Sequence, residues 1–218
     1  MEQRVLVYNS HLEELIASEG EKALAFQWLH DQAEKRYTQF NTYIALPVIV
    51  LSTMSGTASI GQKELFGDTP ISSVVIGLVS ILVGILNTVA SFFGWAKRAE
   101  GHRITSITYS KLHRYISIEL SLPREQRVPA KHFLKAIREQ IDRLNETSPQ
   151  IPQVVITAFR TRFEPVPADI SVPEICNGLH KIEVHPVNAF QEQMSMFRLG
   201  LKTTEEYVRP VDSTPTTE

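Results

Sequence analysis

Two uncharged segments dominate the pattern of hydrophobic and polar positions along the chain. Residues 37–62 and 69–96 contain no Asp, Glu, Lys or Arg, whereas the rest of the 218-residue sequence mixes charged and apolar positions. A helix of about 20 predominantly apolar residues is long enough to cross the hydrocarbon core of a bilayer. We therefore expect two transmembrane helices, at residues 37–62 and 71–95. The alternative is a soluble protein in which both segments are buried core helices.

The connector between the two expected spans, residues 63–70, is short, so the spans would form an antiparallel hairpin with both termini on one side. The cations next to the membrane on that side are Lys35, Arg36, Lys97, Arg98, Arg103 and Lys111. The connector has a single cation, Lys63. Because cytosolic segments beside membrane spans are enriched in Lys and Arg, we predict an integral membrane protein with both termini in the cytosol. The glycosylation tripeptide Asn145–Thr147 would need the opposite orientation, and we expect it to be unused.

The polar regions around the expected spans have the periodicity of helices. In the N-terminal cytosolic region, residues 1–36, the capping box Ser18–Glu21 predicts a helix that begins there and continues into the first span. This region lacks the apolar core of a signal peptide, so we expect the first span to direct insertion. Residues 96–163 predict a second cytosolic helical region, with a long helix at 96–121 and another at 129–145.

The helix expected at 96–121 has a narrow polar stripe and a wide apolar remainder. The stripe consists of Arg103, Ser106, Ser110, Arg114, Ser117 and Ser121, and the apolar side includes Ile104, Tyr109, Leu112 and Ile118. So wide an apolar arc predicts neighbouring helices on more than one side. The single cysteine, Cys176, excludes a disulfide within the chain.

The composition changes after Glu164, where prolines recur and an irregular C-terminal arm, residues 164–218, is expected. Within it, the spacing of Phe190, Met194, Phe197 and Leu201 predicts a short amphipathic helix near 189–201. The predicted fold class is therefore an all-α membrane protein. It combines an antiparallel two-helix transmembrane hairpin with a cytosolic helical bundle and an irregular arm.

Small or polar residues recur along the second expected span at spacings of 4, 3, 4, 3, 4 and 3. These positions, which we call the seam, are Ser73, Gly77, Ser80, Gly84, Asn87, Ser91 and Gly94. Their mean period of 3.5 favours left-handed helix pairing. Small residues also let two backbones approach closely where lipid provides no hydrophobic driving force. On the first span, Ser52 and Gly56 belong to a similar small face.

Two interpretations of the seam are open. The small faces could pack against each other within the hairpin, or copies of the second span could associate and line an aqueous path. Asn87 sharpens the question, because an amide that faces lipid without a partner costs on the order of 2 kcal/mol or more. A hydrogen bond to Ser52 or Thr53 would satisfy it, and so would the Asn87 side chains of other subunits.

The stretch after the second span is basic, with 11 Lys and Arg against 5 Asp and Glu between Lys97 and Arg143. Basic segments next to a membrane attract anionic headgroups, so Lys97, Arg98 and Arg103 are candidate headgroup contacts. A solvated helix face is the alternative. No nucleic-acid-binding motif accompanies the charge, which disfavours a nucleic-acid partner.

The sequence gives little support for catalysis. It contains no phosphate-binding loop, no glycine-rich dinucleotide turn and no HExxH motif. Glu100 and His102 are two residues apart and would point to different sides of a helix, and the pair His11 and Glu14 is common by chance. We therefore expect no catalytic residue, no metal site and no cofactor.

Several short motifs resemble the SLATT family of two-transmembrane proteins. They are Ala99–Arg103 just after the second span, Tyr109–Leu120, and Ser148–Pro152 with Phe159 downstream. The resemblance covers roughly residues 15–163. It implies a cytosolic helix, a short-looped hairpin and a helical region after the second span. It also implies a pore-forming effector, which in bacterial conflict systems is coupled to nucleotide-synthesising or nucleotide-sensing partners.

The leading hypothesis is an oligomeric membrane effector that permeabilises the bilayer through its second span, with the lipid bilayer and further copies of the chain as partners. The rival is a non-conducting membrane scaffold, for example in a viral or organellar membrane, that recruits a cytosolic protein through its helical bundle. Ion flux separates the two, because only the effector predicts it.

Overall fold

The computed structural model describes residues 6–67, 70–164 and 170–178, which belong to one compact unit, Met1–Leu179. All regular structure within these residues is helical, and no strand occurs among them. The amphipathic helix expected near 189–201 lies outside the described residues. The all-α part of the predicted fold class is confirmed.

Helix α1, Ser10–Ile60, runs without interruption through the first uncharged segment and contains Pro47. It begins eight residues before the predicted capping box, because the Asn9 side chain accepts a hydrogen bond from the Leu12 backbone N–H at 2.7 Å. The predicted start at Ser18 is therefore wrong. Instead, the Ser18 hydroxyl donates to the Leu15 carbonyl within the helix.

The second half of the hairpin follows after a short helix, α2, Gln62–Phe66, in the expected connector. Helix α3, Pro70–Phe93, matches the second expected span and is followed at once by α4, Trp95–Ser121. Between them, Gly94 has a left-handed backbone conformation with φ of +58°. Helices thus cover both uncharged segments and the long segment after them, and α3 and α4 begin and end within two residues of the expected bounds.

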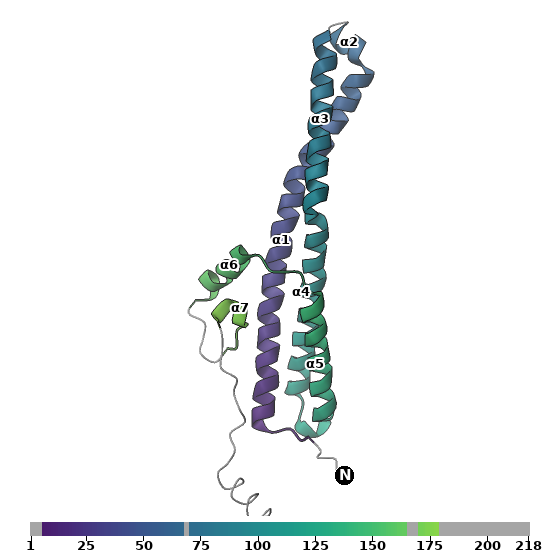
Figure 1. The fold of residues 1–218 in the computed structure, drawn as a ribbon. Helices are drawn as coiled ribbons and strands as arrows, with labels where there is room; N and C mark the ends of the chain where they lie inside the picture. The colour runs from purple at the N-terminus through teal and green to yellow at the C-terminus, as the bar shows by residue number, and fades with distance from the viewer. Residues whose placement is uncertain (1–5, 68–69, 165–169, 179–218) are drawn as a thin grey trace, which may run out of the picture. The chain divides into compact units, whose positions relative to one another are not determined.

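Helices α3 and α4 both pack along α1, as Figure 1 shows. After a 3₁₀ turn, Arg124–Gln126, helix α5, Ala130–Thr147, packs on α4. Helix α6, Gln153–Phe163, packs on α1, and the single turn α7, Glu174–Asn177, packs on α6.

Two hydrophobic cores lie along the first half of α1. One joins α1 to α4 and α5 and contains Leu12, Ile16, Ala23, Tyr109, Leu112, Ile116, Ala130, Phe133, Ile137 and Leu144. The other joins α1 to α6 and α7 and contains Leu29, Ala33, Val155, Ile156, Phe159, Val172 and Cys176. The first half of α1 is therefore the element on which the bundle is assembled.

The faces of α4 agree only in part with the predicted ones: Tyr109 and Leu112 are buried and Arg103 and Arg114 are exposed, as expected. Ser106, assigned to the polar stripe, is buried and its hydroxyl donates to the Gln27 carbonyl of α1. Ile104 and Ile118, assigned to the buried side, are 54% and 57% exposed. The reason is that α4 buries a face shared with α1, on which His102, Thr105 and Ser106 are polar.

Candidate functional site

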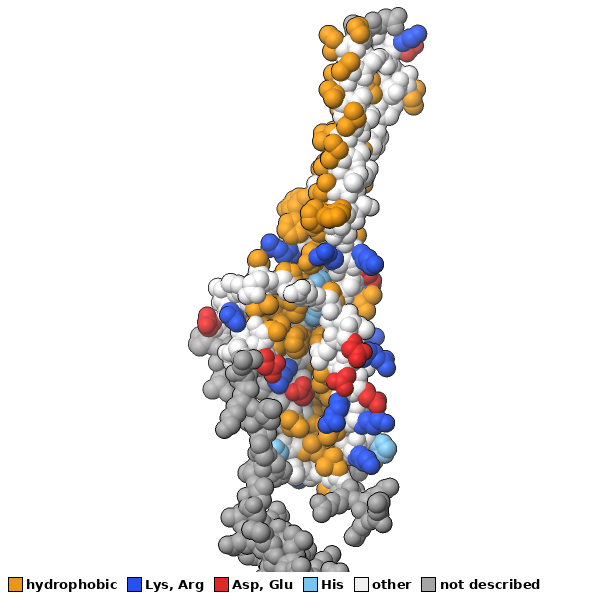
Figure 2. Space-filling model, viewed as in Figure 1, with side chains coloured by type: hydrophobic (Ala, Val, Ile, Leu, Met, Phe, Trp, Pro, Cys, Tyr) orange, Lys and Arg blue, Asp and Glu red, His pale blue; other side chains and the backbone are white. Residues whose placement is uncertain are grey.

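The two uncharged segments form helices long and apolar enough to cross a membrane. In the most apolar 18-residue stretch of α1, 11% of the residues are buried within the protein, and in that of Pro70–Ser121 the share is 6%. A core helix of a soluble protein is mostly buried, whereas most of each of these two segments is exposed. Figure 2 shows hydrophobic side chains along α3 with no charged group among them, and Lys and Arg side chains where the charged part of the molecule begins.

Helices α1 and α3 contact each other through one face of α3. Its buried and half-buried residues are Ser72, Ile76, Val79, Val83, Leu86, Val89 and Ala90. The hydroxyl oxygens of Ser55 and Ser80 lie 2.9 Å apart across this contact. Near the connector, the Gln62 side-chain amide donates to the Ser72 and Ser73 hydroxyls. The hairpin therefore has polar contacts at its connector end and near its middle.

The seam lies on the neighbouring face of α3 and is largely left open. Most seam positions come directly after a residue of the packing face in the sequence. One residue corresponds to a rotation of about 100° around the helix axis, so the seam lies beside that face. Ser73, Gly77, Ser80, Gly84, Asn87 and Ser91 are all exposed. A Cβ atom added to Gly77 or Gly84 would meet nothing within 4 Å. Among the described residues, Ser80 of the seam shares a hydrogen bond with Ser55 of α1, and Ser73 accepts one from Gln62 of α2.

The remaining seam position, Gly94, has a different role from the others. Its left-handed backbone ends α3, and the first turn of α4 starts there with a hydrogen bond from the Arg98 N–H to the Gly94 carbonyl. An L-residue with a side chain is strained in this conformation. Gly94 is therefore explained by the backbone and does not need a packing partner.

The small face predicted on α1 borders the seam. A shallow groove of about 300 Å³ lies between the helices and is lined by Ser52, Ser55, Gly56, Ser59, Ile76, Ser80 and Val83. Gly56 faces open space, and the Ser52 hydroxyl donates to the Val48 carbonyl of its own helix. The α1 small face thus meets the seam at Ser80.

Asn87 has no partner within the hairpin. Its side-chain amide makes no hydrogen bond in the part of the chain that the structure describes. Neither candidate partner on α1 bonds to Asn87: the Ser52 and Thr53 hydroxyls donate to carbonyls one turn earlier and do not accept from its amide. Packing inside the hairpin therefore does not account for Asn87.

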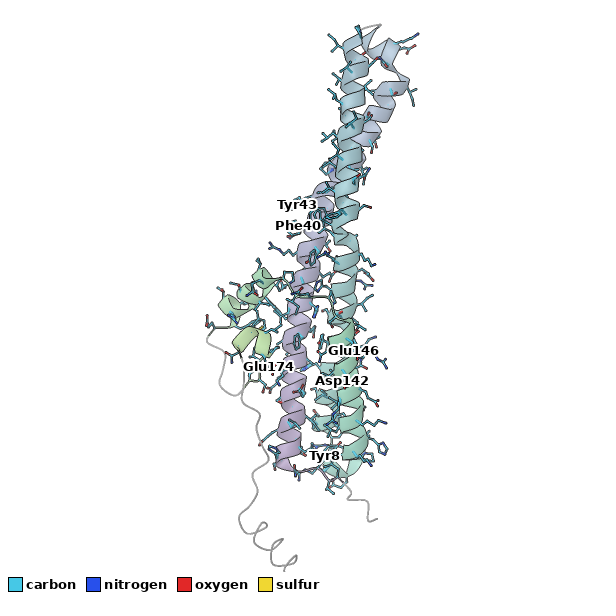
Figure 3. The ribbon with its side chains drawn as sticks, in the orientation of Figure 1. Tyr8, Phe40, Tyr43, Asp142, Glu146 and Glu174 are labelled. Carbon is cyan, nitrogen blue, oxygen red and sulfur yellow. The ribbon has the colours of Figure 1, made fainter. Side chains whose placement is uncertain are left out.

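Aromatic side chains gather where the uncharged segments meet the charged bundle. The Phe93 and Trp95 rings are stacked with centroids 4.9 Å apart, and Phe40 of α1 lies 6.3 Å from Trp95. The Arg36 guanidinium lies over the Phe40 ring at 5.2 Å. Figure 3 labels Phe40 and Tyr43 at this boundary, and Tyr43 is 73% exposed. In membrane proteins, Trp and Tyr are enriched at the interface between bilayer and water.

The three candidate headgroup contacts differ in their charge environment. The Arg103 guanidinium makes two hydrogen bonds to the Glu100 carboxylate, at 2.7 and 2.8 Å, which lower the pKa of Glu100 and largely neutralise the pair. Lys97 and Arg98 are exposed and form no ion pair within the described residues. The structure therefore favours Lys97 and Arg98 over Arg103 as contacts for an anionic surface.

A buried histidine pair joins α1 to α4, and the sequence analysis missed it. The Nδ1 atoms of His30 and His102 are 2.8 Å apart, and both side chains are 1% exposed. Burial and the neighbouring imidazole lower the pKa of His30 to about 3, and burial and the Arg98 charge lower that of His102 to about 4. The two residues are 72 positions apart, so no local spacing could have signalled their contact.

The bundle also has an apolar groove on the α6 side of α1. It measures about 530 Å³ and is lined by Glu21, Leu24, Ala25, Gln27, Trp28, Asp31, Phe159, Phe163, Ile170, Ser171 and Val172. The rings of Phe159 and Phe163 both meet Trp28 edge to face. No group of three or more metal-ligating side chains occurs among the described residues. The apolar α3 surface, the groove beside Trp28 and the histidine pair are thus the described features that bear on function.

No family model, curated protein or solved structure matches the chain.

Proposed function

We propose that this chain is an integral two-pass membrane protein whose copies associate through the seam of α3 to form a pore or otherwise perturb the bilayer. Residues 37–62 and 71–95 cross the membrane, and both termini lie in the cytosol with the basic boundary at Lys97 and Arg98. The aromatic cluster around Trp95 lies at the interface between bilayer and water. The resemblance to SLATT proteins implies the same class of activity.

The observation that carries the proposal is the position of the seam relative to the hairpin contact. If the small residues served only to join α1 to α3, they would be covered by α1. Most are instead exposed and face open space at Gly77 and Gly84. In lipid, close backbone approach at small residues is a principal source of helix association, so a second copy of the chain is the natural partner of this surface.

Asn87 adds chemistry to this surface. Its exposed amide has no hydrogen bond within the hairpin, and an unsatisfied amide in hydrocarbon costs on the order of 2 kcal/mol or more. Association around a common axis would place the Asn87 amides of several subunits near one another or against water. Either arrangement satisfies the amide, and the second would provide the polar lining that an aqueous path needs.

Ion flux from liposomes that contain the purified protein tests this function. We expect flux from the wild type and its loss in Asn87→Leu and Gly84→Leu, because the first removes the amide and the second fills the seam. Val74→Leu is the matched control, since Val74 is 60% exposed on another face of α3 and should tolerate the larger side chain without effect. Insertion of every variant is checked by resistance to carbonate extraction.

The outcomes separate the two functions that the sequence left open. Flux that persists in both seam variants would exclude the seam as the conducting or associating surface. A tight membrane around correctly inserted wild-type protein would instead support the non-conducting scaffold. The apolar groove beside Trp28 favours that alternative, because an exposed apolar groove on the cytosolic bundle is a suitable site for a protein partner.

A further inference from the structure

The His30–His102 contact has an unusual hydrogen-bonding requirement. A neutral imidazole carries hydrogen on one ring nitrogen only. Because the two Nδ1 atoms are 2.8 Å apart, one must carry a hydrogen and the other must accept it. The two histidines therefore adopt opposite tautomers, and together they form one hydrogen bond between α1 and α4.

The surroundings of the pair are aromatic. The Tyr109 ring stacks on His30 with centroids 5.7 Å apart, and the Tyr37 ring stacks on His102 at 5.4 Å. Burial raises the pKa of Tyr109, so this phenol stays neutral. Among the described residues, Arg98 is the charged side chain that acts on the pair, and its positive charge opposes protonation of His102.

The carboxylates on the same helices do not compensate a charge on the pair. Asp31 is bound to Lys35 at 2.6 Å, and Glu100 is bound to Arg103. Glu34 lines a polar groove of about 230 Å³ that also includes Ala99, one helical turn from His102. Neither histidine lines this groove, and Glu34 makes no hydrogen bond to either imidazole.

Within the part of the chain that the structure describes, no titrating group of the other elements acts on either imidazole. The segment 148–152, Ser148–Pro152, lies against α4, where Pro149 is the nearest neighbour of Gly101. Helix α5 approaches Tyr109 with Ile141 and Asn145. Helix α6 meets α1 through apolar side chains, and its Arg160 donates to the Cys176 carbonyl.

We propose that the His30–His102 pair is a proton-sensitive contact that holds α1 and α4 together when neutral and separates them when both imidazoles are protonated. The first proton preserves the hydrogen bond, because an imidazolium Nδ1–H still donates to the remaining lone pair. The second proton can bind only to that lone pair. It leaves two N–H groups and two positive charges facing each other in a buried, aromatic site, and this arrangement is relieved only by separation.

The sign of the pH dependence follows from the direction of the pKa shifts. We call the state in which the pair joins α1 to α4 closed, and the state in which the two helices have separated open. In the closed state the pKa values are about 3 for His30 and about 4 for His102, whereas a solvated histidine titrates near 6.5. The closed state is therefore favoured above pH 6.5 and loses this advantage progressively as the pH falls towards 4 and then 3. At pH 5, proton binding shifts the closed-to-open ratio by about 30-fold for each histidine.

Separation of α1 from α4 is a property of the bundle itself, whereas its transmission to the spans rests on the proposed membrane function. Both helices continue directly into the hairpin, α1 without a break and α4 through Gly94. Opening of the pair would consequently change the angle at which the two spans enter the bilayer. The closed-to-open change and the ion flux can be measured independently.

The test uses distances between spin labels in the full chain, with Cys176→Ser and labels at Leu24→Cys on α1 and Ile107→Cys on α4. Both labelled positions are exposed and uncharged. We expect a narrow distance distribution at pH 7.5, and a longer and broader one at pH 4.5 that reverses on neutralisation. The double variant His30→Gln/His102→Gln should lose this shift, whereas His132→Gln, an exposed histidine of α5, should retain it.

Two results would overturn the proposal: wild-type distances that do not change between pH 7.5 and 4.5, or a shift that survives in the double variant. If the double variant does not reproduce the wild-type distance at pH 7.5, nitrogen-15 NMR of the imidazoles decides. If both histidines remain neutral at pH 4.5, the proton-sensitive contact is contradicted. If both become protonated as the distance between the labels grows, it is supported.

Flux measurements on the same samples keep this proposal apart from the membrane function. If the labels separate at low pH but liposomes with the wild-type protein show no flux at any pH, the proton-sensitive contact is supported and pore formation is rejected. Flux that is present at both pH values, with unchanged distances between the labels, would support pore formation and reject the proton-sensitive contact.

Discussion

Gly20 shows how a single residue sets the distance between two helices. A Cβ atom at this position would lie 3.0 Å from Cγ2 of Ile116 on α4. The Gly20 carbonyl also lies 2.9 Å from Nδ1 of His113. The sequence analysis assigned Gly20 to a capping box, but its importance lies in the close contact between α1 and α4.

We expect Gly20→Leu to lower the free energy of unfolding of the bundle by about 2–3 kcal/mol, because the new side chain has no room beside Ile116. Gly101→Ala is the matched control. Its Cβ would meet Pro149 at an ordinary 3.5 Å, so better helix propensity should raise the stability by up to about 1 kcal/mol. Chemical denaturation in detergent, followed by circular dichroism, measures both. Equal stability of Gly20→Leu and the wild type would refute the packing role.

At the scale of an element, the junction between α3 and α4 depends on the backbone of Gly94. The uncharged segment and the basic helix after it would otherwise form one continuous helix. The left-handed residue interrupts the chain next to the stacked Phe93 and Trp95 rings. The break therefore coincides with the boundary between apolar and charged surface.

Replacing Gly94 by alanine should cost about 1–2 kcal/mol, since an L-residue is disfavoured in the left-handed region. Gly84→Ala should be neutral or slightly stabilising at dilutions where the chain is monomeric, because Gly84 is within a regular helix and faces open space. Detergent-based unfolding compares the two variants. Identical effects of both substitutions would mean that the backbone of Gly94 imposes no such constraint.

Helix α4 illustrates why a buried face is difficult to assign from periodicity alone. Apolar positions cover most of its circumference, so the sequence analysis expected this wide apolar arc to be buried. The structure buries Tyr109, Leu112 and Ile116 of that arc, but it also buries the polar residues His102, Thr105 and Ser106. Each of these side chains has a specific partner: the Thr105 hydroxyl donates to the Gly101 carbonyl, Ser106 bonds to Gln27, and His102 bonds to His30.

At the scale of the whole molecule, the proposed orientation places Lys63 and the charged bundle on opposite sides of a membrane. Single cysteines at Lys63 and Glu125, both exposed, report on the two sides in a Cys176→Ser background. We expect a membrane-impermeant maleimide to label Lys63→Cys on intact cells, and Glu125→Cys only after permeabilisation, because the basic residues beside the spans favour the cytosol.

The reverse labelling pattern would overturn the orientation while leaving the hairpin intact. Recovery of the wild-type protein in the soluble fraction without detergent would reject the membrane location itself. It would support the alternative of a soluble helical protein.

The sequence by itself determined the helical elements that have strong, continuous signals. Long runs without charge, such as residues 37–62, predict apolar helices, and the 3.5-residue mean period of the seam follows directly from its positions between Ser73 and Gly94. The ends of helices are harder to predict, because several side chains near the start of a helix can act as its N-cap, as Asn9 does here. Ser18 looked equally suitable but lies within the helix.

Only the tertiary structure decided which faces of these helices meet. A shift of one position rotates a contact by about 100°, so whether Ile76 or Gly77 faces α1 depends on how the complete helices pack. The same holds for His30 and His102, which only the antiparallel pairing of α1 and α4 brings together. Periodicity is a property of one segment, whereas a partner is selected by shape, hydrogen bonding and burial across segments that are far apart in the chain.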